Sequence, residues 1–485
     1  MSQVQQEADI TSHPLLPNTR FPLSINGVSV HTERQGVINP ATGEVFAQYS
    51  VGGREELEAA VESARKAFPD WSRMPLADRQ RKVSQLADLL IAHEETFIRL
   101  LTLEQGKARA GAEWEIGGCI HWLQEIAKQS LPEKIIRKNA KERVISRHVP
   151  LGVIGAITPW NFPLLLALWK VAPALVSGNT VVLKPSPYTP LCTLWFGELA
   201  QSILPPGVLN VVAGGNEMGQ WLTEHPKVDK ISFTGSTATG RQVMKSAALN
   251  IKRVTLELGG NDPAIVLPDV DPKAVAKELF WAAFQNSAQF CVATKRLYIH
   301  DLIYDEVAEA LCEYAAQVKL GNGLDPETQL GPLQNQMQYD KVCELIESTR
   351  NAGLRFLAGG EVPNGKGYFV PITLVDNPPD DARCVVEEAF GPVLPLLRYR
   401  TIAEVIKRAN STEFGLAASV WGRDLKRAQE VAEQIEAGTV WINQVHIFSP
   451  HIPFGGHKQS GLGIENALDG LSEYTNVQTI MSHAL

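Results

Sequence analysis

Two residues that can perform covalent chemistry stand out in the sequence because of their neighbours. Cys291 lies in the stretch QFCVATKR, with an aromatic residue before it and two cations close downstream. Glu257 interrupts the apolar run VTLEL immediately before two glycines. A thiolate is a strong nucleophile, and a carboxylate in an apolar strand either pairs with a cation or has a raised pKa that suits a general base. The residues alone leave Cys291 open between an apolar filler and a nucleophile, and Glu257 open between an ion-paired or capping acid and a base.

Four short stretches rich in Gly, Pro and polar residues mark places where a ligand can bind. They are TPWNFP (158–163), LKPSPYTP (183–190), FTGSTATG (233–240) and LELGGNDP (256–263). Loops after strands hold the ligands of α/β enzymes, although each stretch taken alone is equally typical of a tight turn. Gly235 and Ser236 open a predicted helix whose N-terminus can bind a pyrophosphate. Lys184 ends the apolar strand TVVL, where its ammonium either reaches ribose hydroxyls or lies at the surface.

The elements that must position these residues alternate along the chain. Amphipathic helical stretches over 54–68 and 77–101 come first, and after residue 150 short apolar runs alternate with helix-like segments. The apolar runs are LGVIGAITP, NTVVLKPS, GVLNVVAGG and DKISFTGS. This βαβ pattern predicts a doubly wound parallel sheet with a nucleotide-sized crevice.

The alternation resumes after Cys291, which predicts a second α/β domain. Its candidate strands, separated by helices such as 401–411 and 424–437, are KRLYIH, LRFLAGG, PVLPLLRY, LAASVWG and GTVWIN. Residues 134–149 alternate like an exposed hairpin, and residues 471–485 have extended character. Because long strands with free edges need a partner, we predict that both segments are oligomer contacts.

Composition excludes several classes of function. The chain has 485 residues and a formal net charge of −8, and its Lys and Arg residues are scattered, which argues against nucleic-acid binding. The N-terminal twenty residues show no basic and apolar leader, and the longest apolar run is too short to span a bilayer, so a cytoplasmic protein without membrane contact is expected. Six cysteines without a Cys-x-x-Cys pair suggest neither a disulfide framework nor a metal site.

The chain resembles the aldehyde dehydrogenase superfamily from about residue 20 to its C-terminus. The resemblance rests on seven motifs that occur in the order typical of that family. They are PWNFP, GNTVVLKPS, FTGST, LELGGNDP, QFCVATKR, EEAFGPVLP and PFGGHKQSGLG. A hydrolytic, NAD(P)-dependent aldehyde dehydrogenase is therefore expected.

The resemblance implies a catalytic set. Cys291 aligns with the thiol that attacks the aldehyde carbon to form a thiohemiacetal, and Asn161 with the Cys291 N–H would hold its oxyanion. After hydride transfer to the nicotinamide, Glu257 would activate the water that hydrolyses the thioester to a carboxylic acid. Lys170 and Glu465 match a pair that relays the proton of the base to solvent in some members.

The resemblance also implies NAD as the cofactor. Glu388 matches the residue that bonds the nicotinamide ribose, and Phe390 matches the aromatic residue beside the nicotinamide. The full set of expected cofactor contacts is Lys184, Gly235, Ser236, Glu388, Phe390 and Trp160. Many NAD-selective members have Glu at the position of Pro187, where it binds the adenosine ribose and repels a 2′-phosphate. Since that repulsion is missing, we expect NADP to be tolerated.

Two further departures from the family pattern affect the site. Ala288 stands where many members have Gly, so the turn before the nucleophile must form without glycine's freedom of φ. Ile464 stands where members have Arg, next to Glu465.

The expected route to Cys291 is apolar. By the resemblance it is lined, beside Trp160, by Phe162, Leu166, Trp169, Phe290, Ile447 and Phe448. Residues of these types often simply fill a core. A semialdehyde carboxylate would need an Arg, and none occurs among them, so the wall favours hydrocarbon or aromatic tails. The expected substrate is a medium-chain aliphatic or aromatic aldehyde.

The expected architecture is an α/β fold of the aldehyde dehydrogenase type in a homodimer or homotetramer. It would have a Rossmann-type cofactor domain (1–129 and 150–256), an α/β catalytic domain (257–459) and a small β oligomerisation element (130–149 and 460–485). Two alternatives use the same fold: a coenzyme-A-acylating semialdehyde dehydrogenase, which generally lacks the general-base Glu, and a non-catalytic crystallin-like binding protein. The joint presence of Cys291, Glu257, Asn161 and Lys184 favours the hydrolytic enzyme.

Overall fold

The first of two large sheets carries the strands that end at the predicted ligand loops. The computed structural model describes residues 21–483, so the N-terminal residues that bear on localisation lie outside it. The sheet has the strand order β2-β1-β9-β8-β7-β10-β11-β21, and β9, β8, β7, β10 and β11 run parallel. Its strands are β1 (Leu23–Ile25), β2 (Val28–Val30), β7 (Val153–Ile157), β8 (Thr180–Lys184), β9 (Leu209–Val211), β10 (Lys230–Thr234), β11 (Arg253–Glu257) and β21 (Gly461–Leu462). The predicted doubly wound parallel sheet is confirmed.

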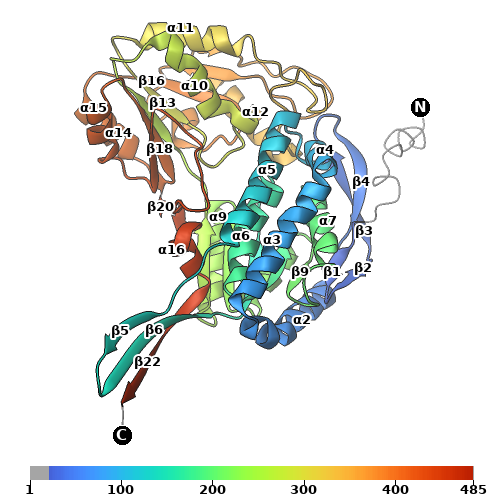
Figure 1. Ribbon diagram of the computed structural model, residues 1–485. Helices are drawn as coiled ribbons and strands as arrows, with labels where there is room; N and C mark the ends of the chain where they lie inside the picture. Colours follow the sequence, from blue (N-terminus) through green and yellow to red (C-terminus); the bar gives the residue numbers. More distant parts are fainter. Residues whose placement is uncertain (1–20, 484–485) are drawn as a thin grey trace, which may run out of the picture.

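Helices cover both faces of this sheet (Figure 1). One face is covered by α2 (Arg54–Arg73), α8 (Asn216–Glu224) and α9 (Thr237–Ala248). The other is covered by α6 (Pro163–Val176) and α7 (Leu191–Ala200), which are backed by α3 (Leu76–Ala92), α4 (Glu94–Gln105) and α5 (Arg109–Ile126). The helical stretch predicted over 77–101 is divided at His93, whose backbone leaves the helical region with φ −123° and ψ 17°.

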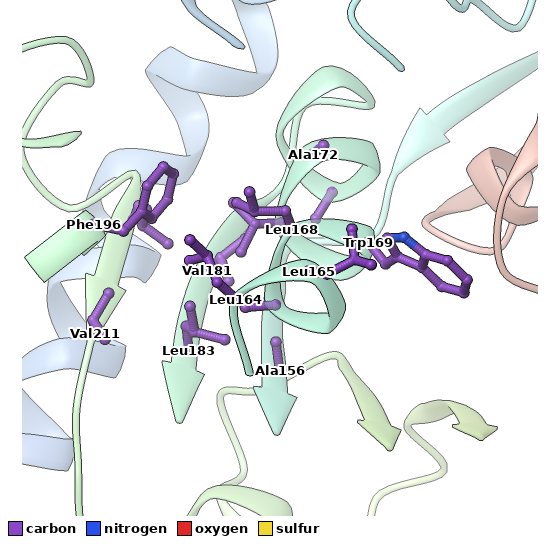
Figure 2. Close-up of a cluster of buried hydrophobic side chains, with 14 of the residues drawn as sticks. Ala156, Leu164, Leu165, Leu168, Trp169, Ala172, Val181, Leu183, Phe196 and Val211 are labelled. Atoms are coloured by element: carbon purple, nitrogen blue, oxygen red, sulfur yellow. The ribbon is translucent and has the colours of Figure 1, made fainter. Parts of the chain in front are cut away.

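The core between α6 and the sheet explains why the apolar run at 163–176 is a buried helix. Leu164, Leu165 and Leu168 of α6 lie against Val181 and Leu183 of β8 (Figure 2). Each fully buried leucine contributes about 1.5–3 kcal/mol of transfer free energy. Pro163 occupies the first helical turn, where its missing N–H costs no hydrogen bond. No helix within residues 21–483 is long and apolar enough to cross a membrane.

A second sheet follows and confirms the predicted second α/β unit. Its strand order is β14-β15-β16-β13-β12-β18-β19, parallel except for β14. The strands are β12 (Pro263–Val266), β13 (Arg296–His300), β14 (Phe356–Ala358), β15 (Thr373–Asp376), β16 (Val393–Tyr399), β18 (Ala417–Trp421) and β19 (Thr439–Ile442). One core contains α10 (Pro272–Phe284) and α11 (Tyr304–Ala315), and the other contains α12 (Gln336–Asn351), α13 (Arg383–Val386), α14 (Ile402–Asn410) and α15 (Leu425–Ala432).

A three-stranded sheet projects from the body of the molecule (Figure 1). Its strands are β5 (Lys134–Lys138), β6 (Glu142–Pro150) and β22 (Thr475–His483), and α16 (Ala467–Ser472) precedes the last of them. The exposed hairpin is confirmed, but its β6 edge is covered: β22 pairs antiparallel with β6 along its whole length, from Thr475↔Pro150 to His483↔Glu142, which leaves β5 and β22 as the edge strands among the described residues. Oligomerisation through this sheet stays a prediction, which the exposure of Ile136 and Met481 supports.

Two small sheets complete the fold. They are β3 (Arg34–Asn39) with β4 (Glu44–Ser50), and β17 (Phe414–Gly415) with β20 (His457–Lys458). Within 460–485, β21 joins the eight-stranded sheet, next to β11, which ends at Glu257. The C-terminal segment therefore contributes to the sheet that carries this acid.

Candidate active site

Cys291 lies at the end of a loop with an unusual backbone. The loop follows α10 through a short turn (Gln285–Ala288), in which Asn286, Ser287 and Ala288 have φ of 53°, 54° and 60°. The expectation that this turn forms without glycine is therefore confirmed. Three consecutive non-glycine residues in the left-handed region cost on the order of 1–3 kcal/mol each, so the surroundings must hold them. Ser287 Oγ donates to the Gly331 carbonyl at 2.6 Å and provides one such restraint.

Asn161 meets this loop directly. Its side-chain Nδ2 donates to the Gln289 carbonyl at 3.0 Å, two residues before Cys291. An amide nitrogen has two N–H donors, so this bond leaves one for a substrate oxygen. Asn286 Nδ2 in turn donates to the Asn161 backbone carbonyl at 3.2 Å. The PWNFP loop and the loop that carries Cys291 are thus joined by hydrogen bonds in both directions.

A buried ion pair that sequence reasoning missed supports Asn161. Lys107 Nζ lies 2.5 Å from Glu115 Oε2 and also donates to the Asn161 carbonyl at 3.0 Å. Glu115 Oε1 accepts from the backbone N–H groups of Leu164 and Leu165 at 3.1 and 3.2 Å, which are free donors at the start of α6. Neither Lys107 nor Glu115 lies in a recognisable motif. The only feature of the sequence that could have indicated their burial is the charge of each residue among largely apolar neighbours.

The environment of Cys291 disfavours its thiolate in the free protein. Burial raises the pKa of the thiol to about 12. Asp262, Glu257 and Glu388 raise this pKa further by their negative charge, whereas the Lys295 ammonium lowers it. The residue as a whole is only partly buried.

Glu257 is a buried carboxylate without a hydrogen-bond partner for either oxygen among residues 21–483. Burial raises its pKa well above 4.5. The two glycines after it permit the close approach of neighbours: a Cβ at Gly259 would lie 2.5 Å from Glu388 Oε2, and one at Gly260 would lie 3.0 Å from the Cys291 carbonyl oxygen.

The predicted pair Lys170 and Glu465 is brought together. Lys170 Nζ lies 2.7 Å from Glu465 Oε1, and both side chains are almost fully buried. The charges of Glu465 and Lys170 act on Glu257 in opposite directions, since Glu465 raises the pKa of Glu257 and Lys170 lowers it. Ile464 therefore does not prevent the pair from forming.

The residues expected to hold a dinucleotide fit that role in their chemistry. Lys184 ends β8, is 4% exposed, and bonds the adjacent Pro185 carbonyl at 3.2 Å. Burial lowers the pKa of Lys184 to about 8, so the ammonium has little compensation inside the protein. Ser236 caps α9 by accepting from the Thr239 N–H at 3.2 Å. A Cβ at Gly235 would lie 2.5 Å from the Phe233 ring, so a larger residue there would have to displace that ring.

Of three further expected cofactor residues, Trp160 and Phe390 contact each other, and Glu388 lies two residues before Phe390 in the chain. The Trp160 and Phe390 rings meet edge to face at 5.3 Å. Phe390 has φ 50°, and its carbonyl accepts from Gln338 Nε2 at 3.2 Å. Glu388 Oε1 accepts from the Gly260 N–H at 3.1 Å. A buried ammonium, a helix N-terminus and a carboxylate thus surround the C-terminal ends of the parallel strands, which is where α/β folds bind dinucleotides.

The predicted apolar wall is a cluster of aromatic rings. Phe290 contacts Phe162 with ring centroids 4.5 Å apart and Phe448 at 6.0 Å, and Trp169 contacts Phe448 at 5.9 Å. Leu166 is partly buried against the same core, whereas Ile447 is 52% exposed. The rings that sequence reasoning missed are Trp114, Trp122, Trp441, His446 and Phe454. Phe454 lies within the quoted motif PFGGHKQSGLG but was not assigned to the wall, and the other four lie outside the quoted motifs.

His446 places a titratable side chain in this wall. Its ring lies 4.6 Å from the Phe290 ring; Nε2 lies 3.3 Å from the Val292 carbonyl oxygen, and Nδ1 lies 2.8 Å from the side-chain amide of Gln285. Burial lowers the pKa of His446 to about 4, so it is neutral at physiological pH. The wall therefore remains uncharged at this position.

Comparison with known proteins identifies relatives over nearly the whole chain. The family model described as "Aldehyde dehydrogenase family" matches residues 28–480. Phenylacetaldehyde dehydrogenase from Pseudomonas fluorescens is 39% identical, covering 97% of this chain and 98% of its own. The NAD⁺ complex of aldehyde dehydrogenase from Bacillus cereus is 37% identical with a TM-score of 0.94, covering 100% of this chain and 99% of its own. Betaine aldehyde dehydrogenase from Staphylococcus aureus in complex with NAD⁺ is 33% identical with a TM-score of 0.94, covering 98% and 97%.

The chain belongs to the aldehyde dehydrogenase family. The fold and enzyme class expected from its motifs are those of an NAD(P)-dependent aldehyde dehydrogenase, and the match over nearly the whole chain confirms both.

Proposed function

We propose that this enzyme oxidises apolar aldehydes to carboxylic acids through a covalent Cys291 intermediate, with NAD as the cofactor. The observation that carries the substrate class is the aromatic wall beside Cys291, in which Phe290 contacts both Phe162 and Phe448. The NAD-bound relatives and the fit of Lys184, Ser236 and Glu388 support the cofactor. Bound NAD supplies the hydride acceptor.

Cys291 and Asn161 perform the first half of the reaction. The thiolate attacks the aldehyde carbon, and negative charge develops on the aldehyde oxygen as the thiohemiacetal forms. The free Asn161 N–H and the Cys291 backbone N–H donate to that oxygen. Lys107 and Gln289 hold the Asn161 backbone and side chain, so the donor needs no reorganisation at the moment of attack.

Glu257 performs the second half. As a carboxylate it accepts a proton from water, and the resulting hydroxide attacks the thioester carbon; the C–S bond breaks and leaves the carboxylic acid and the Cys291 thiolate, while Glu257 holds the proton taken from water. The absence of a partner for either Glu257 oxygen among residues 21–483 suits a role in which water is the partner. Lys170 and Glu465 pass the proton onward from this base.

The uncharged wall and one relative support an apolar substrate. Lys107 lies over the Phe162 ring at 4.0 Å, but Glu115 neutralises its charge, so the wall offers no free cation at that position. Each buried methylene contributes about 0.8 kcal/mol, so affinity should grow with chain length until the wall is filled. Phenylacetaldehyde dehydrogenase, an aromatic-aldehyde enzyme by its name, is similar over nearly the whole chain.

A panel of aldehydes tests this proposal. We expect kcat/KM to rise from acetaldehyde to octanal, phenylacetaldehyde to be accepted, and succinate semialdehyde to be poor. Phe448→Ala should weaken the preference for octanal more than the activity on acetaldehyde, whereas the matched Phe448→Leu should keep most of it. Succinate semialdehyde or betaine aldehyde ahead of octanal would contradict the proposal. Cys291→Ala, the negative control, should abolish turnover without weakening NAD binding.

Cofactor choice has its own test at Pro187. The Pro187 carbonyl lies at hydrogen-bond distance from the Tyr49 hydroxyl, 3.5 Å, and its ring carries no charge to repel a 2′-phosphate. We propose that NAD is preferred and that NADP has measurable activity. Pro187→Glu should lower kcat/KM for NADP more than for NAD. A wild-type enzyme that is inert with NADP would show that another group excludes the phosphate.

A further inference from the structure

Lys295 connects the nucleophile to the expected nicotinamide end of the site. Its ammonium donates to the Cys291 carbonyl and lies 3.3 Å from Glu388 Oε1. The Lys295 side chain is 6% exposed. Burying an ammonium costs free energy unless it is paired. Here one partner belongs to the expected nucleophile, Cys291, and the other to the expected ribose ligand, Glu388.

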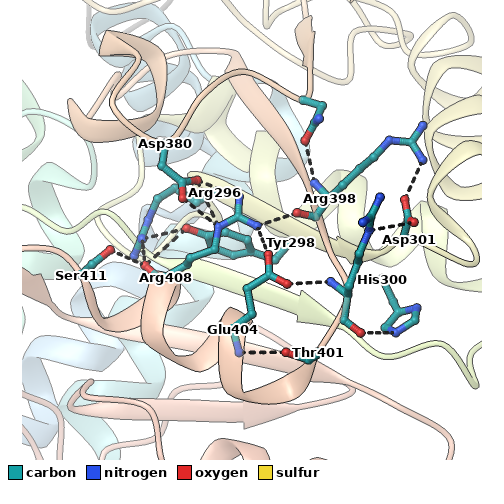
Figure 3. A network of polar contacts seen from close by, with 12 residues as sticks. Arg296, Tyr298, His300, Asp301, Asp380, Arg398, Thr401, Glu404, Arg408 and Ser411 are labelled. Carbon is teal, nitrogen blue, oxygen red and sulfur yellow. Dashed lines mark hydrogen bonds and ion pairs between the residues drawn. The ribbon is translucent and has the colours of Figure 1, made fainter.

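Rigid elements place both ends of this connection. The Lys295 backbone N–H donates to the Asp262 carbonyl at 2.9 Å. The next residue, Arg296, begins β13 and donates to the Arg408 and Ala409 carbonyls at 3.1 and 2.9 Å. Figure 3 shows Arg296 within the polar network that also contains Arg408. The ammonium is therefore held where it is by the sheet that follows the nucleophile.

Glu388 is held from the other side. Gly260 donates its N–H to Glu388 Oε1, the same oxygen that faces Lys295, at 3.1 Å. The missing side chain of Gly259 leaves the space for Oε2, which would lie 2.5 Å from a Cβ there. The carboxylate thus lies between the GG pair and the ammonium.

The ion pair between Lys295 and Glu388 affects the balance of charge around Cys291. Asp262, Glu257 and Glu388 oppose the thiolate, and Lys295 favours it. While Glu388 is paired with Lys295, it neutralises the cation that favours the thiolate. Any ligand that moves the Glu388 carboxylate away from Lys295 leaves more of the positive charge to Cys291.

We propose that Lys295 is a positioning residue that couples occupancy of the nicotinamide ribose site to the reactivity of Cys291. In the free enzyme Glu388 neutralises the Lys295 ammonium, and the thiol is protonated and unreactive. When the ribose hydroxyls take the Glu388 carboxylate, the ammonium stabilises the Cys291 thiolate. The nucleophile is thereby activated only when a hydride acceptor is present. The inference rests on the proposed roles of Cys291 as nucleophile and of Glu388 as ribose ligand.

The test measures the thiol directly and not turnover. Alkylation of Cys291 by iodoacetamide is followed by peptide mass spectrometry across pH, with and without NAD. In the free enzyme, Glu388→Gln should speed alkylation at neutral pH by about tenfold, because one pKa unit corresponds to a tenfold change in thiolate. NAD should speed alkylation of the wild type, and Lys295→Met should abolish that acceleration. Lys295→Arg should retain part of it.

A matched control distinguishes the effect of the Lys295 ammonium from that of any other lysine that contacts Glu388. Lys341 Nζ donates to the Glu388 backbone carbonyl at 2.7 Å, not to the carboxylate, so Lys341→Met should keep the wild-type response to NAD. Either of two results would overturn the coupling. The first is a wild-type alkylation profile for Glu388→Gln, a variant in which Lys295 is intact. The second is a response of Lys295→Met to NAD. Failure of the nucleophile assignment looks different, because Cys291→Ala would then remain active.

Discussion

Lys170 Nζ and Glu465 Oε1 lie 2.7 Å apart although 295 residues separate them in the chain. Each side chain is 1% exposed. Ser232 Oγ donates to the same Glu465 oxygen at 3.3 Å, while Oε2 has no partner among residues 21–483. A buried pair with one free oxygen, electrostatically coupled to Glu257, is suited to receive a proton from that base.

Substitutions of the two partners should move the pH profile in opposite directions. Lys170 lowers the pKa of Glu257 and Glu465 raises it. The base works only when deprotonated, so Lys170→Met should shift the acid limb of kcat to higher pH, and Glu465→Gln should shift it to lower pH. Lys170→Met should also cost about 3–5 kcal/mol of stability, because it leaves an unpaired buried carboxylate. Shifts in the same direction would indicate a purely structural pair.

Removal of the base should trap the acyl-enzyme. Glu257→Gln should produce one equivalent of NADH per active site and then stall, because the amide cannot accept a proton from water. Rapid-mixing absorbance would show the burst, and intact-protein mass spectrometry would show the acyl group. In the wild type, burial raises the pKa of Glu257, so deacylation should slow as pH falls through that pKa. A variant with neither burst nor adduct would place Glu257 in thiol activation.

Affinity for NAD should depend on the charge of Lys184. Burial lowers the pKa of Lys184 to about 8, so the ammonium loses its proton as pH rises through that value. A neutral amine is a weaker donor, and NAD binding measured by fluorescence should weaken about tenfold at high pH. Lys184→Met should bind weakly at all pH values. The control is Lys252, whose pKa is also lowered to about 8 but whose ammonium bonds two carbonyls elsewhere. Lys252→Met should therefore keep the wild-type pH dependence.

The Lys107–Glu115 pair should support both folding and catalysis. Lys107→Met leaves a buried carboxylate uncompensated and should lower the free energy of unfolding by about 3–5 kcal/mol. Adding Glu115→Gln should restore stability but not kcat, since Asn161 still lacks the donor to its carbonyl. Denaturant melts and steady-state kinetics would separate the two effects. In the exposed pair of Arg109 with Glu113, Arg109→Ala should cost at most about 1 kcal/mol.

Local sequence predicted much of the fold, and the family resemblance supplied the expected site residues, whose roles stay predictions. The apolar runs at β7, β8 and β10 were correctly interpreted as parallel strands, because a strand buried on both faces reads as a continuous apolar run. Helix signals failed where tertiary contacts override local preference. The break at His93 coincides with the packing of its ring against Trp195, with centroids 5.4 Å apart.

The pairing of the projecting strands shows the same limit. Alternation indicated that 134–149 and 471–485 are extended, but it carried no information on which strand lies beside which. The structure pairs β22 with β6, so that one of the edges expected to face another subunit is covered within the chain.

The sequence by itself supplied the set of candidate site residues in loops and at strand ends: Cys291, Glu257, Asn161 and Lys184. Their residue types and immediate neighbours are local properties, so they can be recognised from the sequence alone. Only the tertiary structure decided the partners, Lys107 with Glu115 and Lys295 with Glu388. Charge pairing and burial depend on distances between segments that are far apart in the chain. Hydrophobic periodicity gives only the conformation and the expected exposure of each residue, so it carries no information on those distances.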